Sequence, residues 1–229
     1  MRVRRAPVGA AAAFASAERP AAGLGWREAG WCAIDLEMTG LDPRSDQIMA
    51  VGAVPVEDGR IRLGGGMYTL VRASKRSQVG AVLVHKLRLA DVADAPSLDE
   101  AIDLLLGALA GRVPVFHTAA IESAFLERLF AGRHVRLPTA VDTEMLGRRW
   151  LRHRDGADRA PAQGISLGRL AQELGQPAET PHHALGDALT TAKAFISLAS
   201  LLDTVAPQTV GSLLAASERP AVVRRFGPG

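Results

Sequence analysis

Residues 31–40 read Trp31-Cys32-Ala33-Ile34-Asp35-Leu36-Glu37-Met38-Thr39-Gly40, an apolar run that leads into two carboxylates and a turn. An apolar run of this length, closed by Thr39-Gly40, predicts a short buried strand. Because alternate residues of a strand face the same side, Asp35 and Glu37 should point the same way. Two adjacent carboxylates repel each other unless a cation lies between them, and a hard divalent cation with oxygen ligands meets that need.

The same D-x-E pattern occurs a second time, at Asp142-Thr143-Glu144. A chain of this size should contain about one such pattern by chance, so the pattern alone is a weak signal. The second copy opens a predicted helix, where acids stabilise the N-terminal dipole. The first copy follows a strand and precedes Gly40, where the backbone can approach a ligand closely. We therefore place the candidate site at the first copy.

Two further segments carry residues suited to the same chemistry. Asp187 lies in the first turn of a predicted helix and His182 lies just before it, so both could face one cleft. His117 ends a predicted strand, and Glu122 falls in the first turns of the next helix. From the residues alone, Glu122 is equally a surface acid favoured by the helix dipole. A second His-x4-Asp pair, at residues 153 and 158, lies in a polar segment and is interpreted as a solvated surface pair.

The pattern around these segments predicts the fold class. Strands are predicted at 31–36, 47–56, 60–71, 113–116 and up to 141, with an interruption of the third at Gly64-Gly65-Gly66. Helices are predicted at 98–109 behind a Ser97/Glu100 capping box, and at 119–130, 166–174 and 185–202. Residues 152–164 are predicted to form an exposed loop. Three antiparallel strands followed by alternating strands and helices indicate an α/β fold, with a mixed five-stranded sheet flanked by helices.

Composition narrows the class of protein. The chain has 229 residues, of which 48% are hydrophobic and 22% are charged, as in a globular protein. The net charge of +3 is compatible with a polyanionic partner without arguing for one. The single cysteine, Cys32, excludes an internal disulfide and is interpreted as a buried structural thiol, which fits a cytoplasmic location.

The two ends of the chain are predicted to lie outside the domain. Residues 1–26 are rich in Ala, Arg and Pro, and their middle stretch has almost no Leu, Ile or Val, so it is too weak for the apolar region of a signal peptide. We interpret them as a flexible leader, residues 27–203 as the domain, and residues 204–229 as a poorly structured tail. No run approaches the roughly 18 apolar residues of a membrane span, so no membrane partner is expected.

Three motifs in register resemble those of the DEDDh exonucleases, the family of the DNA polymerase III epsilon proofreading subunit, oligoribonuclease and RNase T. Residues 35–40 are similar to the first family motif, D-x-E-T-T-G, and residues 182–188 match the third, H-x-A-L-x-D-A. Residues 117–126 are similar to the second, H-N-A-x-F-D-x-x-F-L, with Glu122 in place of its Asp. The resemblance extends over roughly residues 27–203.

The resemblance implies an RNase H-like fold and a role for each motif. Asp35, Glu37 and Asp187 would hold one divalent cation, and Asp35 would bridge to a second that Glu122 supports; both cations would be Mg²⁺ or Mn²⁺. His182 would be the general base for 3′→5′ hydrolysis of phosphodiester bonds to nucleoside 5′-monophosphates. The implied substrate-binding residues are Met38, Thr39, Leu41, His85 and His117.

The expected partner is the 3′ end of single-stranded nucleic acid, with DNA preferred over RNA, and a polymerase or another protein is a further candidate. Two other functions stay open. One is a catalytically weak module that keeps the fold and binds nucleic acid or protein, which the Glu122 replacement favours. The other is a metal-dependent nucleotide phosphohydrolase that uses the same chemistry on a smaller substrate.

Overall fold

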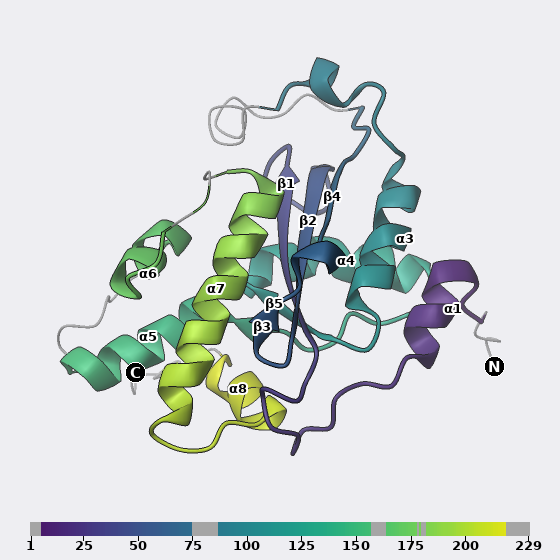
Figure 1. Ribbon diagram of the computed structural model, residues 1–229. Coiled ribbons are helices and arrows are strands. Elements are labelled where there is room, and N and C mark those ends of the chain that lie inside the picture. The colour runs from purple at the N-terminus through teal and green to yellow at the C-terminus, as the bar shows by residue number, and fades with distance from the viewer. Residues whose placement is uncertain (1–5, 75–86, 157–163, 178, 180–181, 219–229) are drawn as a thin grey trace, which may run out of the picture.

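A mixed β-sheet forms the centre of the computed structural model, which describes residues 6–74, 87–156, 164–177, 179 and 182–218 (Figure 1). Its strands run in the order β3-β2-β1-β5-β6, and β4 also pairs with β2. β1 is antiparallel to β2 and parallel to β5. The strands are β1 (Trp31–Met38), β2 (Ile48–Glu57), β3 (Arg60–Ile61), β4 (Met67–Leu70), β5 (Val113–Phe116) and β6 (Val141–Asp142).

The predicted α/β class is confirmed, but the sheet has six strands where five were predicted. The extra strand arises because the predicted third strand is divided into β3 and β4 by a short 3-10 helix, η1 (Leu63–Gly65). The glycines at 64–66 lie at this division, where the sequence predicted an interruption. Both pieces pair antiparallel with β2, at different ends of that strand.

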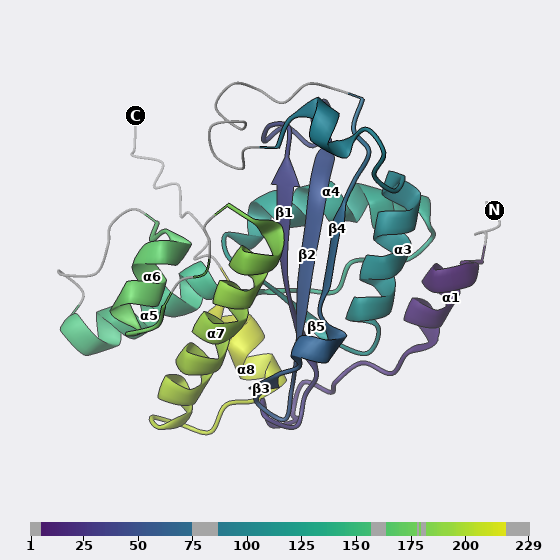
Figure 2. The same cartoon turned by 45° about the horizontal axis from the view of Figure 1, so that its top comes forward.

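Helices cover both faces of the sheet, and β1 shows which residues face which layer (Figures 1 and 2). Trp31 and Ala33 belong to the core shared with α7 (Ala184–Asp203), α5 (Thr143–Asp155), α6 (Leu167–Glu173) and α8 (Val210–Ala216). Cys32 and Ile34 belong to the opposite core, shared with α1 (Gly9–Ser16), α3 (Leu98–Leu109) and α4 (Ala119–Gly132). By the same alternation along β1, the Asp35 side chain lies on the face of the sheet that α7 covers.

Local signals explain where the helices begin. Ser97 accepts a hydrogen bond from the Glu100 backbone N–H, and the Glu100 carboxylate accepts one from the Ser97 N–H, which is the predicted capping box. The prediction of a loop over residues 152–164 is wrong in its first part, because α5 continues to Asp155. The arginine-rich sequence there forms the last turn of this helix, where positive charge favours the dipole and Arg154 lies 4.5 Å from the Trp150 ring centroid.

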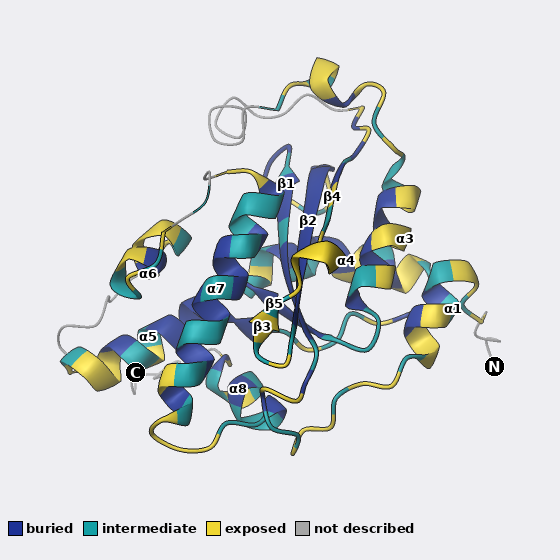
Figure 3. Ribbon diagram, viewed as in Figure 1, coloured by how far each residue is buried: buried dark blue, intermediate teal, exposed yellow. Residues whose placement is uncertain are grey.

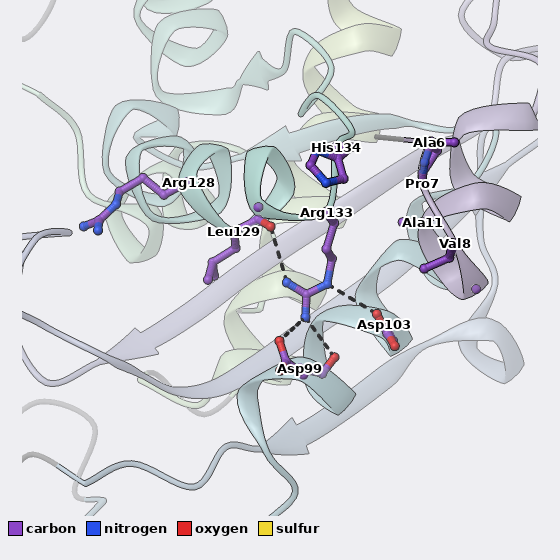
Figure 4. A pocket seen from close by; sticks show the side chains of 12 residues that line it. Ala6, Pro7, Val8, Ala11, Asp99, Asp103, Arg128, Leu129, Arg133 and His134 are labelled. Carbon is purple, nitrogen blue, oxygen red and sulfur yellow. Dashed lines mark hydrogen bonds and ion pairs between the residues drawn. The ribbon is translucent and has the colours of Figure 1, made fainter. Parts of the chain in front are cut away.

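The prediction of a flexible leader is corrected by α1. Its Phe14 ring is buried and meets the Phe130 ring of α4 edge-on, with centroids 5.6 Å apart. A cavity of about 690 Å³ lies between α1, α3 and α4, and none of its lining residues belongs to the predicted site. Arg133 crosses this cavity to the carboxylates of Asp99 and Asp103 (Figure 4). The sequence hides the helix because α1 (GAAAAFAS) consists mostly of alanine, which favours helices without giving an amphipathic pattern.

The prediction of a poorly structured tail is also corrected, because α8 packs on the core through Val210 and Leu213. The segment before β1 runs beside it: Gly25 and Thr209 form an antiparallel bridge, and the Trp26 N–H donates to the Gln208 carbonyl. These contacts join residues far apart in the sequence, so neither segment shows them locally. The domain boundaries at 27 and 203 stay predictions.

Among the described helices, α7 alone is long and apolar enough to cross a membrane by length and composition. Its inner face, which includes Ala188, Ala192 and Phe195, is fully buried against the sheet (Figure 3). The apolar composition of α7 is therefore explained by its place in the core.

Candidate active site

The end of β1 and the start of α7 bring three carboxylates together. Asp35 and Glu37 lie on β1 two residues apart, and Asp187 lies in the first turn of α7. One oxygen from each of the three lies within 4.8 Å of the others. The sequence predicted this convergence from two separate motifs, and the structure brings all three residues to one place.

Gly52 allows α7 to come this close. It pairs with Asp35 across the β1–β2 ladder. The two residues therefore lie side by side in one row that runs across the strands of the sheet. A Cβ atom on Gly52 would collide with the backbone of Ala184 and Leu185, at the first turn of α7. The helix therefore rests directly on the backbone of β2, which places Asp187 over the row that carries Asp35.

Glu122 enters the site from α4, whose start is held by a third segment. The Asp142 carboxylate accepts hydrogen bonds from the backbone N–H groups of Thr118 and Ala119. It also caps α5 by accepting from the Glu144 N–H. This confirms that the second D-x-E opens a helix, and it shows that Asp142 fixes the turn that presents Glu122.

Burial and mutual repulsion shape the electrostatics of the cluster. Burial raises the pKa of Asp35 well above its usual range, and the carboxylates of Glu37, Glu122 and Asp187 raise it further. Burial, followed by the Asp187 carboxylate, raises the pKa of Glu37 to about 7. Burial, reinforced by Asp142, raises the pKa of Glu122 to about 8.

Contacts within the fold partly stabilise the negative charge of the Asp187 carboxylate. Burial raises its pKa, while a hydrogen bond from the His182 backbone N–H, at 2.8 Å, acts in the opposite direction. Across the described part of the chain, no arginine or lysine forms an ion pair with Asp35, Glu37, Glu122 or Asp187. The cluster therefore gathers negative charge without a cationic side chain to balance it.

These residues fit a divalent cation. Carboxylate oxygens are the ligands that Mg²⁺ and Mn²⁺ prefer. The Oε2 atom of Glu122 is buried and has no hydrogen-bond partner, which is costly for an oxygen that no ligand contacts. Glu122 does not belong to the group of three within 4.8 Å, but its carboxylate is close enough to raise the pKa of Asp35.

The two neighbouring histidines of the third motif have different surroundings. His182 is exposed, and its backbone has a φ of 61°, in the left-handed region that few residues other than glycine adopt. His183 is the N-cap of α7, where its Nδ1 accepts from the Gly186 N–H at 3.4 Å. The His183 ring also stacks on the Tyr68 ring, with centroids 4.5 Å apart and an interplanar angle of 24°.

A protein-family model described as Exonuclease matches residues 32–195, which include all four carboxylates and both histidines. The chain belongs to this exonuclease family. It is 33% identical over 185 residues to the DNA polymerase III subunit epsilon-like protein of Rhodobacter capsulatus, a match that covers 79% of this chain and 25% of that protein. It is 27% identical over 175 residues to the PolC-type DNA polymerase III of Thermotoga petrophila, covering 75% of this chain and 12% of that one. The chain thus spans a quarter or less of the length of these relatives.

Solved structures confirm the RNase H-like exonuclease fold. Exonuclease X in complex with 5′ overhanging duplex DNA has a TM-score of 0.63 and 23% identity, over 82% of this chain and 99% of that one. Escherichia coli Exonuclease I in complex with a dA16 oligonucleotide has a TM-score of 0.60 and 16% identity, over 77% of this chain and 41% of that one.

The remaining predicted substrate-binding residues of this exonuclease domain have varied surroundings. The Thr39 hydroxyl is buried, donates to Asp46 Oδ1 at 3.0 Å, and accepts from the Gln47 N–H at 3.0 Å. Met38 is half-buried at the end of β1, and Leu41 is 68% exposed. His85 lies outside the described residues.

The ring of His117, which lies within the described part of the chain, has a hydrogen-bond partner at each of its two nitrogens. Its Nδ1 lies 3.0 Å from Thr143 Oγ1, and its Nε2 lies 2.8 Å from the Ile165 carbonyl, to which it donates. Burial lowers the pKa of His117, so the neutral ring fits these partners. The His117 ring thereby ties β5 to residue 165, and its role toward substrate stays a prediction.

Sequence reasoning missed Gly52 and Tyr68. A glycine in the middle of a β-rich run is a local sign of close backbone approach, so Gly52 could have been found. Tyr68 carries no such sign, because its link to the site depends on its pairing with Gly52 across β2 and β4. Burial raises the pKa of Tyr68, and the Glu37 carboxylate adds to this, which places the ring beside the site.

Proposed function

We propose that this exonuclease domain is a 3′→5′ exonuclease that hydrolyses DNA to nucleoside 5′-monophosphates with two divalent cations, Mg²⁺ or Mn²⁺. One observation carries the proposal: Asp35, Glu37 and Asp187 converge within 4.8 Å, and no arginine or lysine among the described residues forms an ion pair with them. Repulsion among these carboxylates destabilises the metal-free fold, which a bound cation would relieve.

Four carboxylates would hold the cations: Asp35, Glu37 and Asp187 as one set, with Asp35 and Glu122 toward the second. When bound, the cations would make the attacking water more acidic and neutralise charge on the leaving 3′-oxygen. The protein contributes rigid placement of these groups, through β1 for Asp35 and through the α7 contact with Gly52 for Asp187.

His182 is the group that we assign to proton transfer. The water oxygen forms a bond to phosphorus, its proton moves to the His182 imidazole, and the bond from phosphorus to the 3′-oxygen breaks. The leaving oxygen then takes a proton from solvent. His182 suits this role because it is exposed beside the carboxylates, whereas His183 is held by the helix cap and by Tyr68.

Single-stranded DNA 3′ ends are the proposed substrate, in preference to RNA. Support comes from the DNA held by the two structural neighbours named above. The polymerase names of the relatives support a polymerase or another protein as partner. A cytoplasmic location is supported by Cys32, the single cysteine of the chain, which is free and buried as expected in a reducing compartment.

The deciding experiment follows products from single-stranded DNA and RNA labelled at either the 5′ or the 3′ end, with Mg²⁺ or Mn²⁺. A ladder that shortens from the 3′ end of 5′-labelled DNA, together with immediate release of labelled mononucleotide from 3′-labelled DNA, is expected. The Asp35→Ala variant, prepared in parallel, identifies any contaminating nuclease.

Each alternative predicts a different result when the same assay is repeated with nucleoside triphosphates present. Hydrolysis of nucleoside triphosphates with intact oligonucleotides would identify a nucleotide phosphohydrolase. Binding of the labelled strand without any products, in the presence of either cation, would identify a non-cleaving module. Faster degradation of RNA than of DNA would overturn the proposed substrate preference while leaving the chemistry in place.

A further inference from the structure

Tyr68 occupies the row of the sheet that carries the site. Asp35 pairs with Gly52, and Gly52 pairs with Tyr68 on β4. Neighbours in one row project to the same face, so the Tyr68 ring emerges on the side where α7 begins. It is the only tyrosine in the chain and is 39% exposed.

The contact that Tyr68 makes there is with the cap of α7. Its ring stacks on the His183 ring with centroids 4.5 Å apart, an arrangement typical of stabilising aromatic pairs. Histidine is not among the preferred N-cap residues, and its bond from the Gly186 N–H is long, at 3.4 Å. The helix cap alone therefore restrains the His183 side chain only weakly, and the stack on Tyr68 adds to this restraint.

His183 in turn connects the two functional residues of its motif. Its backbone carbonyl accepts from the Asp187 N–H at 2.9 Å, and the preceding His182 N–H donates to Asp187 Oδ2 at 2.8 Å. His182 reaches this position with a φ of 61°, a strained backbone conformation that persists only where neighbouring residues enforce it. A restraint on His183 is thus a restraint on the turn that holds His182 over Asp187.

We propose that Tyr68 is a positioning residue, which acts through its stack on His183 to hold His182 and Asp187 in their places relative to Asp35. Tyr68 makes no bond in the reaction. Its ring holds His183 in place by stacking, and its hydroxyl has no part in this role. The proposal rests on the proposed function, because misplacement of His182 is measured as lost turnover.

The test compares Tyr68→Phe, which keeps the ring, with Tyr68→Leu, which keeps bulk without stacking. Tyr68→Phe should retain the wild-type kcat within twofold. Tyr68→Leu should lower kcat about three- to tenfold, the range of an aromatic pair, with KM changed less than kcat. His183→Leu should lower kcat at least as much, because it also removes the Nδ1 cap of α7, and the double variant should be no worse than His183→Leu, because the stack is already lost in that variant.

A second readout does not depend on activity. In the metal-free protein, the NMR signals of the His183 ring protons should carry a ring-current shift that Tyr68→Phe keeps and Tyr68→Leu loses. Melting temperatures by circular dichroism show that each variant is folded. If wild type cleaves nothing, the proposed function fails, and the ring-current shifts still show whether the stack exists. If wild type is active but the two losses are additive, or Tyr68→Phe is as slow as Tyr68→Leu, the positioning role is overturned.

Discussion

Replacing Glu122 with glutamine should make the metal-free protein more stable while impairing catalysis. The Glu122 carboxyl is buried, and burial with the nearby Asp142 raises its pKa to about 8. One of its oxygens has no hydrogen-bond partner. Glutamine keeps the size of the side chain and removes the charge, so it removes the cost of ionisation without opening a cavity.

The magnitude follows from the two pKa values. The carboxyl loses its proton near 4.5 in the unfolded chain and at about 8 in the fold. Between these values the fold binds the extra proton, so each unit of rising pH lowers its stability by about 1.4 kcal/mol. The stability that the protonated Glu122 carboxyl contributes is fully present below pH 4.5, and it is lost as pH rises through about 8. By pH 7 the loss is roughly 3 kcal/mol, and relaxation of the protein around the charge, which raises the effective dielectric constant, reduces it to roughly 1–3 kcal/mol.

Thermal unfolding of the metal-free proteins between pH 5 and pH 8.5 measures this directly. Glu122→Gln should melt roughly 3–10 °C above wild type at pH 7, with the gap closing toward pH 5. Saturating Mg²⁺ should narrow the gap at pH 7, because wild type gains more from binding a cation. The control is Glu127→Gln, an exposed acid on the same helix, which should change stability by less than about 0.5 kcal/mol. A difference in melting temperature between Glu122→Gln and wild type that stays constant across this pH range would refute the reasoning.

The remaining predictions concern the same site. EDTA should abolish cleavage, and Mg²⁺ or Mn²⁺ should restore it and raise the melting temperature; full activity in excess EDTA would rule out the cation mechanism. Asp35→Ala and Asp187→Ala should each abolish cleavage with an unchanged circular dichroism spectrum, and normal rates would remove these residues from the site. His182→Ala should lower kcat by about 10² to 10⁴ while calorimetry shows Mn²⁺ binding within a few fold of wild type. Gly52→Ala should lower the free energy of unfolding by about 1–3 kcal/mol and also reduce kcat, and a fully active, stable variant would show that α7 can shift without harm.

Much of the site could be predicted from short stretches of sequence, because its signals are local. The strand that presents Asp35 and Glu37 is defined by its own apolar run, and the Ser97 capping box marks the start of α3. The position of Asp187 in a first helical turn follows from the helix that begins beside it. These features need no knowledge of what packs against them.

The features that the sequence did not reveal depend on long-range pairing. The register that sets Gly52 between Asp35 and Tyr68 is fixed by two strand pairings, and no local pattern in any one strand encodes it. The bridge between Gly25 and Thr209 likewise joins segments near opposite ends of the chain. The ends gave no local sign of their helices, because α1 is alanine-rich without an amphipathic pattern and α8 packs on residues far away in the sequence.

One helix–sheet contact forms both the core and the site. α7 buries Ala188, Ala192 and Phe195 against the sheet, and the same packing presses its first turn onto Gly52. Repulsion among the carboxylates opposes this contact at one end, and apolar burial along the rest of the helix outweighs it, at roughly 25 cal/mol for each Å². The acids can therefore be held together before any cation binds. It follows that a small cavity in the α7 core, far from the carboxylates, should weaken cation binding through the position of Asp187 as well as lowering stability.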